Sequence, residues 1–138
     1  MLEDLPALAA SLGSAGFLGS FTAYLDYGLL VIEDANSRTR HDEWDDRSAL
    51  VNVRADSLCI RTRVYVDGPV TAVVLKGDKR IAQGHLVFDG RVESASRLLK
   101  IEDSDESACL QVRVPSAVTT LSIFVDRPED VGTVVIVL

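Results

Sequence analysis

Alternation of apolar and polar residues with a period of two is the feature that most limits what this chain can fold into. Within residues 57–66, Leu58 and Ile60 fall on one face, whereas Arg61 and Arg63 fall on the other. Successive side chains of a strand point to opposite faces, so this pattern predicts a half-buried strand. The same alternation returns several times further along the chain.

The alternating segments are short and are separated by turn residues. Residues 67–69 (Asp-Gly-Pro) predict a turn that joins the segment 57–66 to the next strand in a hairpin, because Gly accepts positive φ and Pro fixes its own φ. Residues 89–90 (Asp-Gly) predict another turn. The predicted strands cover residues 21–25, 28–33, 57–66, 70–75, 80–88, 91–101, 110–114, 121–125 and 133–138. About seven to nine short strands with regular turns are typical of an all-β, antiparallel β-sandwich.

The length and composition of the chain predict a single domain. The chain has 138 residues, and its 47% of hydrophobic residues are spread along the whole length, so we expect a single β-sandwich domain over residues 1–138. Residues 1–16 differ from the rest. There we expect a short N-terminal helix and lead-in that dock on the sandwich, because apolar residues recur at helical spacing. These residues are Leu2, Leu5, Leu8, Ala9 and Leu12.

The first residues do not read as an export signal. The first charges are Glu3 and Asp4, and no lysine or arginine precedes Arg38, whereas a secretory signal begins with a positive segment. No apolar run reaches the roughly 20 residues that a membrane span needs. We therefore expect a cytoplasmic protein without a membrane partner.

The apolar side of the alternating strands predicts the core. Its predicted members are Val31, Leu58, Ile60, Val64, Val74, Val112, Val114, Leu121, Ile123, Val125 and Ile136. The two cysteines, Cys59 and Cys109, also lie in apolar strand patterns and lack the spacing of a metal site. In a chain without an export signal this predicts two reduced, free thiols that are at least half buried.

The net charge of the chain indicates which class of partner it favours. There are 21 acidic against 14 basic residues, giving a net charge of -7. A negative field repels phosphate backbones and attracts cationic proteins. We expect no nucleic-acid partner and favour a basic protein.

The residues that enzymes and cofactor sites use are scarce. The only histidines are His41, in a charged loop, and His85, inside a strand pattern, where we expect it to be satisfied by its surroundings. No nucleophile motif, phosphate-binding loop or zinc spacing is present. Calcium is weighed only at the acidic turn near residue 105, which lacks the spacing of an EF-hand, so a solvated turn is favoured. We expect no enzyme, no cofactor and no metal.

Two loops carry the candidate partner-binding residues. The segment 34–46 is long and charged and holds the only tryptophan, and the segment 102–107 is an acidic turn between strands. Long loops in compact domains are often functional. Trp44 has two readings here, either as a plug for the sandwich core or as a binding anchor surrounded by steering carboxylates. The candidates are Asp42, Glu43, Trp44, Asp45 and Asp46, followed by Glu102, Asp103, Asp105 and Glu106.

The order of these segments resembles the competence protein J family, whose members inhibit the DNA-entry nuclease. The matching features are the strand with Tyr24 and residues 27–32, the motif Trp44-Asp45-Asp46, Thr62, residues 87–90 (Val-Phe-Asp-Gly), Glu93 and Ser94. The family has Trp-Thr-Asp where this chain has Trp44-Asp45-Asp46, and the match spans roughly residues 21–126. The resemblance implies a small acidic β-sandwich, of the inhibitor or immunity-protein type, that neutralises a basic nuclease or toxin by covering its active surface.

Two other functions remain open at this point. The chain could be a structural or assembly module that associates with itself, for example as a homodimer. It could also be a small-molecule-binding barrel, which would need a lined cavity. The dependence of binding on salt distinguishes a self-associating module from an inhibitor. Charge-steered binding weakens as ionic strength rises, whereas an apolar interface between identical chains hardly responds.

Overall fold

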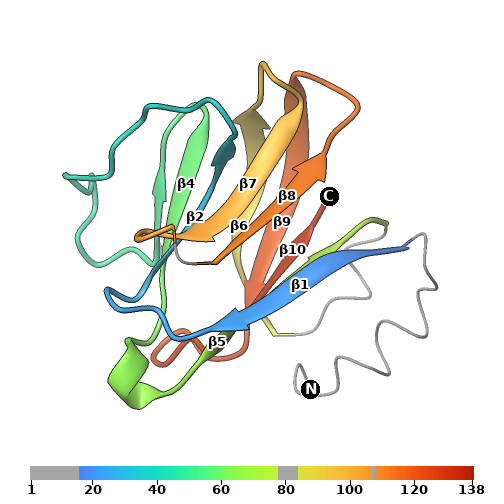
Figure 1. Ribbon diagram of the computed structural model, residues 1–138. Coiled ribbons are helices and arrows are strands. Elements are labelled where there is room, and N and C mark those ends of the chain that lie inside the picture. Colours follow the sequence, from blue (N-terminus) through green and yellow to red (C-terminus); the bar gives the residue numbers. More distant parts are fainter. Residues whose placement is uncertain (1–15, 78–83, 107) are drawn as a thin grey trace.

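The computed structural model describes residues 16–77, 84–106 and 108–138, and within them the chain folds into ten strands and one short 3-10 helix (Figure 1). The helix predicted for residues 1–16 lies almost wholly outside the described residues. The elements are β1 (Phe17–Ala23), β2 (Leu29–Asp34), β3 (Val51–Val53), β4 (Ser57–Arg61), η1 (Tyr65–Asp67), β5 (Val70–Leu75), β6 (His85–Glu93), β7 (Leu98–Asp103), β8 (Cys109–Arg113), β9 (Val118–Val125) and β10 (Thr133–Val137).

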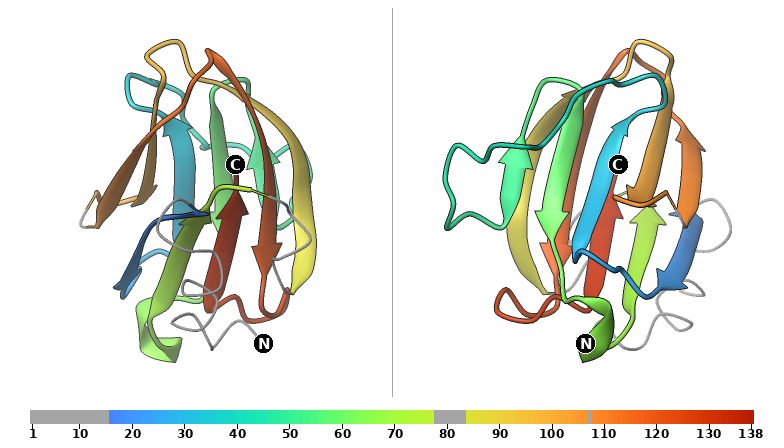
Figure 2. Two further views of the ribbon diagram at one scale, coloured as in Figure 1. Left: turned by 90° about the vertical axis from the view of Figure 1, so that its right-hand side faces the viewer. Right: turned by 60° about the vertical axis from the view of Figure 1, so that its left-hand side comes forward.

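The strands form two sheets of five, which lie face to face as two layers (Figure 2). One sheet has the order β1-β5-β10-β9-β6 and the other has the order β3-β4-β2-β7-β8. Neighbouring strands are antiparallel, except that β10 runs parallel to β5. The predicted all-β, antiparallel-rich sandwich is confirmed, with one strand more than the expected upper count of nine.

The inner faces of both sheets share one apolar core. Leu58, Ile60, Ile123 and Ile136 are completely buried in it, and nine of the eleven predicted core residues belong to it. The other two, Val31 and Val64, are only partly buried. Val31 points to the outer face of its sheet because Leu30 and Ile32 take the inward positions of β2.

A second, smaller apolar cluster lies on the opposite face of the central strands β5 and β10. It contains Val73, Leu75, Val135 and Val137, with Phe17 and Phe124 packed against it. Strand β10 is therefore buried on both faces, as expected from its uninterrupted apolar sequence. In the described parts of the chain, no helix has the length and apolar character to cross a membrane.

The hairpin predicted for residues 57–75 is wrong. Strand β4 ends at Arg61, and β4 and β5 belong to different sheets. Thr62 still bonds to the Gly28 carbonyl beside β2, but the backbone then leaves this sheet, because the Arg63 N–H bonds to the Val131 carbonyl ahead of β10 in the other sheet. The alternation continues through Val66 in the sequence, but η1 replaces the strand there and leaves Val66 exposed.

The turn predicted at residues 89–90 is also wrong, because both residues lie inside β6. This strand pairs with β9 as far as Glu93, and the break comes after it, within the predicted strand 91–101. Asp89 accepts a hydrogen bond from the Ser122 hydroxyl at 2.9 Å. A Cβ at Gly90 would lie 2.9 Å from Cζ of Phe88, so a larger residue there would have to displace the Phe88 ring.

A buried carboxylate joins two connections at one end of the sandwich, the β2–β3 loop and the β6–β7 connection. Asp34, at the end of β2, accepts hydrogen bonds from the Ser94 hydroxyl at 2.7 Å and from the Ser96 N–H and the Asn36 N–H at 3.1 Å each. Burial raises the pKa of Asp34, but the hydrogen bonds from Ser96 and Ser94 outweigh this and leave the pKa below its usual value. Asp34 therefore fixes the start of the long β2–β3 loop, residues 35–50.

We predict that Ile123→Ala lowers the free energy of unfolding by about 2–5 kcal/mol, because it opens a cavity in a closed core. Urea denaturation followed by circular dichroism measures this loss. Val66→Ala is the matched control. Its side chain is 69% exposed, so the change should stay within about 0.5 kcal/mol. Equal losses in both variants would contradict the assignment of Ile123 to the core.

Candidate protein-binding surface

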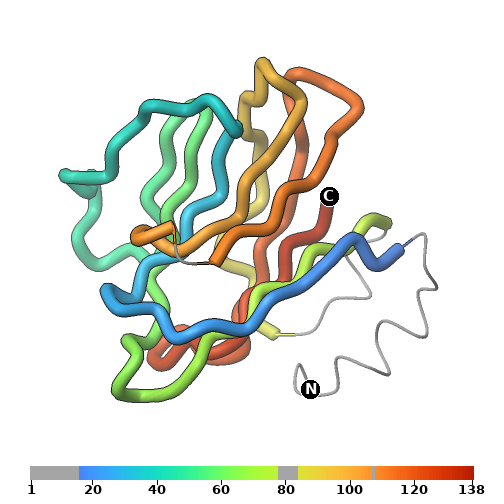
Figure 3. Tube along the Cα trace, in the orientation of Figure 1, coloured from blue at the N-terminus to red at the C-terminus, as the bar shows by residue number. Residues whose placement is uncertain are grey.

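The outer face of the sheet β3-β4-β2-β7-β8 is unusual because, beside Val31 and Cys59, it carries polar side chains that are buried or mostly buried. The strand register places them side by side, with Glu33 opposite both Ser57 and Lys100. Among the described elements, the β2–β3 loop lies beside this face and returns to the sheet at β3 (Figure 3). These outward-facing residues are Glu33, Asn52, Ser57, Lys100 and Glu102.

His41 links the β2–β3 loop to this polar face. Its Nε2 lies 2.8 Å from the Ser57 hydroxyl oxygen, and its Nδ1 lies 2.9 Å from the Asn52 side-chain nitrogen. The Asn52 amide donates to Nδ1, so Nε2 carries the proton and donates to Ser57. The Ser57 hydroxyl in turn donates to Glu33 at 2.9 Å. Each member of the chain of hydrogen bonds is satisfied, which holds the loop on the sheet.

This arrangement of serine and histidine differs from that of a hydrolase. In a catalytic triad the imidazole accepts the serine proton and a carboxylate orients the imidazole. Here His41 faces Ser57 with its N–H, and the carboxylate of Glu33 accepts from the serine. Ser57 is also completely buried. The hydrogen bonds therefore stabilise the loop and do not activate Ser57 as a nucleophile.

Lys100 lies between two carboxylates of the same face. Its ammonium is 3.1 Å from Glu102 and 3.6 Å from Glu33. Burial raises the pKa of Glu33 above its usual value, while the Ser57 hydrogen bond and the Lys100 charge act in the opposite direction. Burial lowers the pKa of Lys100, but Glu102 and Glu33 outweigh it and raise that pKa overall. Lys100 is therefore the cation that allows two carboxylates to be buried together.

Two arginines contact the acidic tip of the β2–β3 loop, residues 42–46. Arg54 bonds the Asp45 carboxylate at 3.1 Å and the Glu43 carbonyl at 3.0 Å. The Arg61 guanidinium lies over the Trp44 ring, 4.2 Å from its centroid. Trp44 is half-buried and lies outside both apolar clusters. It is therefore not a core plug, and its role as a binding anchor stays a prediction.

Several predicted acidic candidates lie on the surface. Asp42, Glu43, Asp45 and Asp46 are exposed in the β2–β3 loop, although Asp46 is used within the loop to accept from the Ser48 hydroxyl at 2.6 Å. Asp105 and Glu106 are exposed in the turn after β7.

Glu102 and Asp103 differ from the other candidates because both are buried. Strand β7 continues to Asp103, so the predicted turn from residue 102 begins two residues later, and its last residue, 107, lies outside the described residues. The pairing of Glu102 with Lys100 explains this, since it makes a carboxylate compatible with a covered strand position. Glu102 and Asp103 cannot contact a partner without rearrangement.

The two acidic segments, far apart in the sequence, meet at one hollow of about 280 Å³. Asp42 borders it from the β2–β3 loop, and Glu106 borders it from the β7–β8 turn. His41, Glu33 and Glu102 line its floor and walls. The outer face of this sheet is therefore framed by carboxylates on two sides.

The cysteines differ from each other. Cys59 is buried and Cys109 is exposed, and both are free, so the prediction of two half-buried thiols is wrong for Cys109. Cys109 opens the edge strand β8, where the alternation turns it outward. Burial raises the pKa of the Cys59 thiol to about 12. Partial burial and then the Glu102 charge raise the pKa of Cys109, so neither thiol is activated as a nucleophile.

The sequence missed the central part of this surface. His41, Asn52, Ser57 and Lys100 were not predicted to act together, although Glu33, Ser57, Lys100 and Glu102 all occupy outward positions of adjacent strands. A search for polar residues at the outward positions of the predicted strands would have found these four residues. It would not have found His41, which lies in a loop. Among residues 16–77, 84–106 and 108–138, no cluster of His, Cys, Asp and Glu could hold a metal ion.

Comparison with known proteins supports a relationship in fold. No protein-family model matches this sequence, and no curated protein matches it. The structure is similar to the crystal structure of ComJ, inhibitor of the DNA degrading activity of NucA, from Bacillus subtilis, with a TM-score of 0.69. The sequences are 11% identical, and the match covers 88% of this chain and 94% of that chain. The predicted resemblance to the competence protein J family is confirmed, and at this identity it concerns the fold.

We predict that Lys100→Met destabilises the protein by about 3 kcal/mol near pH 7.5, because it leaves two carboxylates buried without their cation. A raised carboxyl pKa contributes stability below the unfolded value of 4.5 and loses it as pH rises through the folded pKa. The loss should therefore be smaller at pH 5. Urea denaturation at both pH values measures it, with the exposed Lys76→Met as control. A loss that does not depend on pH would contradict the role of Lys100.

We also predict a pH effect from His41. Burial, and then the Arg54 charge, lower the pKa of His41 below its usual value of 6.5. The stability that neutral His41 contributes is thus complete above about pH 6.5 and is lost as pH falls through the folded pKa. The stability difference between the wild type and His41→Gln should shrink between pH 7.5 and pH 5.5. Because Glu33 titrates in both proteins, this difference isolates His41, and a constant difference would refute the prediction.

Proposed function

We propose that this chain is an acidic protein-binding module that inhibits a NucA-like nuclease by covering the basic surface on which that enzyme binds DNA. The observation that carries the proposal is that two acidic segments, distant in sequence, border one hollow on the outer face of one sheet. Cationic surfaces that hold DNA phosphates are complementary to such a face.

The fold supports the same partner class. The structurally similar protein ComJ is an inhibitor of the DNA degrading activity of NucA. In this chain, the inverted Ser57–His41 hydrogen bond and the inactive thiols also argue against catalysis. An inhibitory role needs only a stable, charged surface.

The proposed contact residues are the exposed acidic residues of the β2–β3 loop and the β7–β8 turn, which we call the acidic frame. Asp42, Glu43, Asp105 and Glu106 supply the negative potential, while Asp45 and Asp46 add charge and also shape the loop. Trp44 would contribute contact area beside them, in the position that Arg61 fixes for its ring. A ring that is ordered before binding loses less entropy in the complex, which favours affinity.

The test uses nuclease activity. The chain is immobilised at low salt, exposed to extract of its own cells, and the retained fraction is assayed for DNA degradation after elution. In parallel, purified NucA of Bacillus subtilis is assayed with increasing amounts of the chain. Retention of a nuclease whose activity falls when the chain is added back, or inhibition of NucA, supports the proposal. If no nuclease is retained and NucA is unaffected, the proposal fails.

We predict that Asp42→Lys and Asp105→Lys each slow association with the inhibited nuclease about tenfold at low salt and flatten its salt dependence. Stopped-flow or surface plasmon measurements at several ionic strengths provide the rates. Glu93→Lys is the matched control, since it makes the same change of charge at an exposed position of β6, in the other sheet. If Glu93→Lys slows association as much, only the net charge matters and the proposed face is not the contact.

A further inference from the structure

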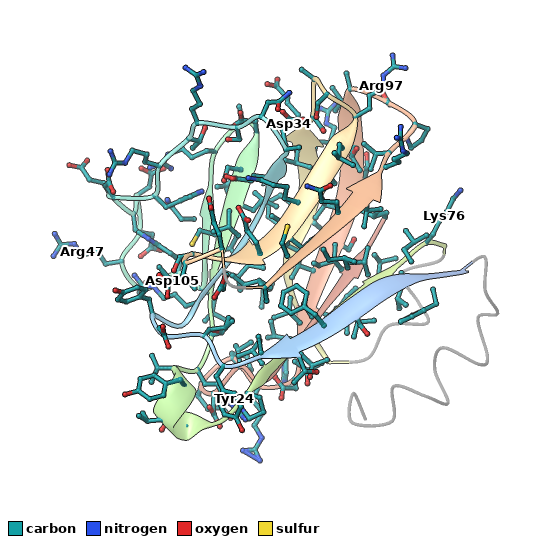
Figure 4. The ribbon with its side chains drawn as sticks, in the orientation of Figure 1. Tyr24, Asp34, Arg47, Lys76, Arg97 and Asp105 are labelled. Atoms are coloured by element: carbon teal, nitrogen blue, oxygen red, sulfur yellow. The ribbon has the colours of Figure 1, made fainter. Side chains whose placement is uncertain are left out.

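The three tyrosines of the chain are all exposed, together with one valine, at one end of the sandwich. They come from two separate segments, the β1–β2 turn and η1. Figure 4 shows Tyr24 at this end, opposite the end that holds Asp34. The exposed fractions are 63% for Tyr24, 68% for Tyr27, 53% for Tyr65 and 69% for Val66. We call these four residues the tyrosine end.

Backbone contacts show that the two segments lie side by side. The Thr62 N–H bonds to the Gly28 carbonyl at 2.8 Å, which joins the β1–β2 turn to the segment leading into η1. Ala23, the last residue of β1, pairs with Val70, the first residue of β5. This pair brings the start of the β1–β2 turn beside the end of the segment that contains η1. The aromatic side chains are therefore presented by neighbouring stretches of backbone.

Core packing and a close backbone approach hold the β1–β2 turn of the tyrosine end in place. Leu25 lies between the two tyrosines of the β1–β2 turn and is buried in the core. Gly28 has φ of 64°, and a Cβ there would lie 2.8 Å from the Thr62 carbonyl oxygen, so only glycine allows the turn to sit this close to the next segment. The turn is fixed before any partner binds, which reduces the entropy lost on binding.

Carboxylates border the tyrosine end. Asp26 lies in the turn between two of the tyrosines, and Asp67 is in η1. Partial desolvation, and then the neighbouring Asp26 carboxylate, raise the pKa of Asp105 in the β7–β8 turn, which places the two carboxylates close together. The nearby cation Arg63 is engaged with Asp130, at 3.0 Å and 3.1 Å. The border is therefore negative and is continuous with the acidic frame described above.

We infer that the tyrosine end is the anchor of the interface, where the rings receive arginine side chains from a cationic surface of the protein partner; the identity of that partner rests on the proposed function. Clustered exposed aromatics mark protein-binding sites, and tyrosine is enriched among residues that dominate binding energy. Arginine stacks on aromatic faces and is further attracted by adjacent carboxylates. The chain already contains this geometry internally, where Arg61 lies over Trp44.

The inference is tested with full-length protein and two probes, the nuclease that the chain inhibits and a nonapeptide of arginine, by isothermal titration calorimetry. The triple variant Tyr24→Ala/Tyr27→Ala/Tyr65→Ala should weaken binding of the nuclease at least about thirtyfold, as expected for removal of a dominant anchor. The corresponding triple Tyr→Phe variant keeps the ring faces and should bind within about threefold of the wild type. Leu86→Ala/Val118→Ala removes exposed apolar side chains elsewhere and is the matched control.

The outcomes separate this inference from the proposed function. If the triple alanine variant inhibits the nuclease as well as the wild type does, the inhibitor function stands and the tyrosine end is not its anchor. If no nuclease is inhibited but the arginine peptide needs the tyrosines for binding, the anchor stands and the proposed function fails. Equal binding of the peptide to both proteins overturns the inference. So does tyrosine-dependent binding of a single-stranded oligonucleotide, which would make the partner a nucleic acid.

Discussion

The apolar contact between two five-stranded sheets is the constraint on which the rest of this structure depends. Burial of side chains such as Ile60 and Ile123 between the layers provides the main favourable free energy of folding. The chain forms this contact by alternating antiparallel pairs of consecutive strands, such as β3–β4 and β7–β8, with crossings between the sheets, as between β4 and β5. Each crossing places a connecting segment at an end of the sandwich. The tyrosine end and the Asp34 end are both products of these connections.

The outer face of one sheet adds a second constraint, because it covers charged groups. A buried carboxylate is costly unless it is paired and hydrogen-bonded. Lys100, Ser57 and His41 meet that requirement for Glu33, and in doing so they tie the β2–β3 loop to the sheet. The loop that carries the acidic tip is thus ordered by the electrostatics of the face that it covers. Stability and the display of charge depend on the same few residues.

The two surfaces proposed for binding have complementary physical roles. The acidic frame acts over distances of about a Debye length and affects mainly the rate of encounter. The tyrosine end acts only on contact and affects mainly how long a complex lasts. Asp105 connects them, since it belongs to the acidic turn and lies close enough to Asp26, in the turn that carries two of the tyrosines, for the Asp26 charge to raise its pKa. A partner seated on one surface would therefore reach the other.

The sequence by itself determined the fold class, most of the core and the sign of the surface charge. Period-two alternation is a local property, so it identified β8 and β9 and the burial of Leu58 and Ile123 without knowledge of their neighbours, and an uninterrupted apolar run identified β10. It could not find the end of β4, because the alternation continues through Val66 while the Arg63 N–H bonds to Val131, ahead of a strand of the other sheet. Only the tertiary structure decided that Glu102 is buried, that His41 meets Ser57 and that Tyr24, Tyr27 and Tyr65 share one end. Those facts depend on strand register and sheet crossing, which bring together residues that no short window of sequence contains.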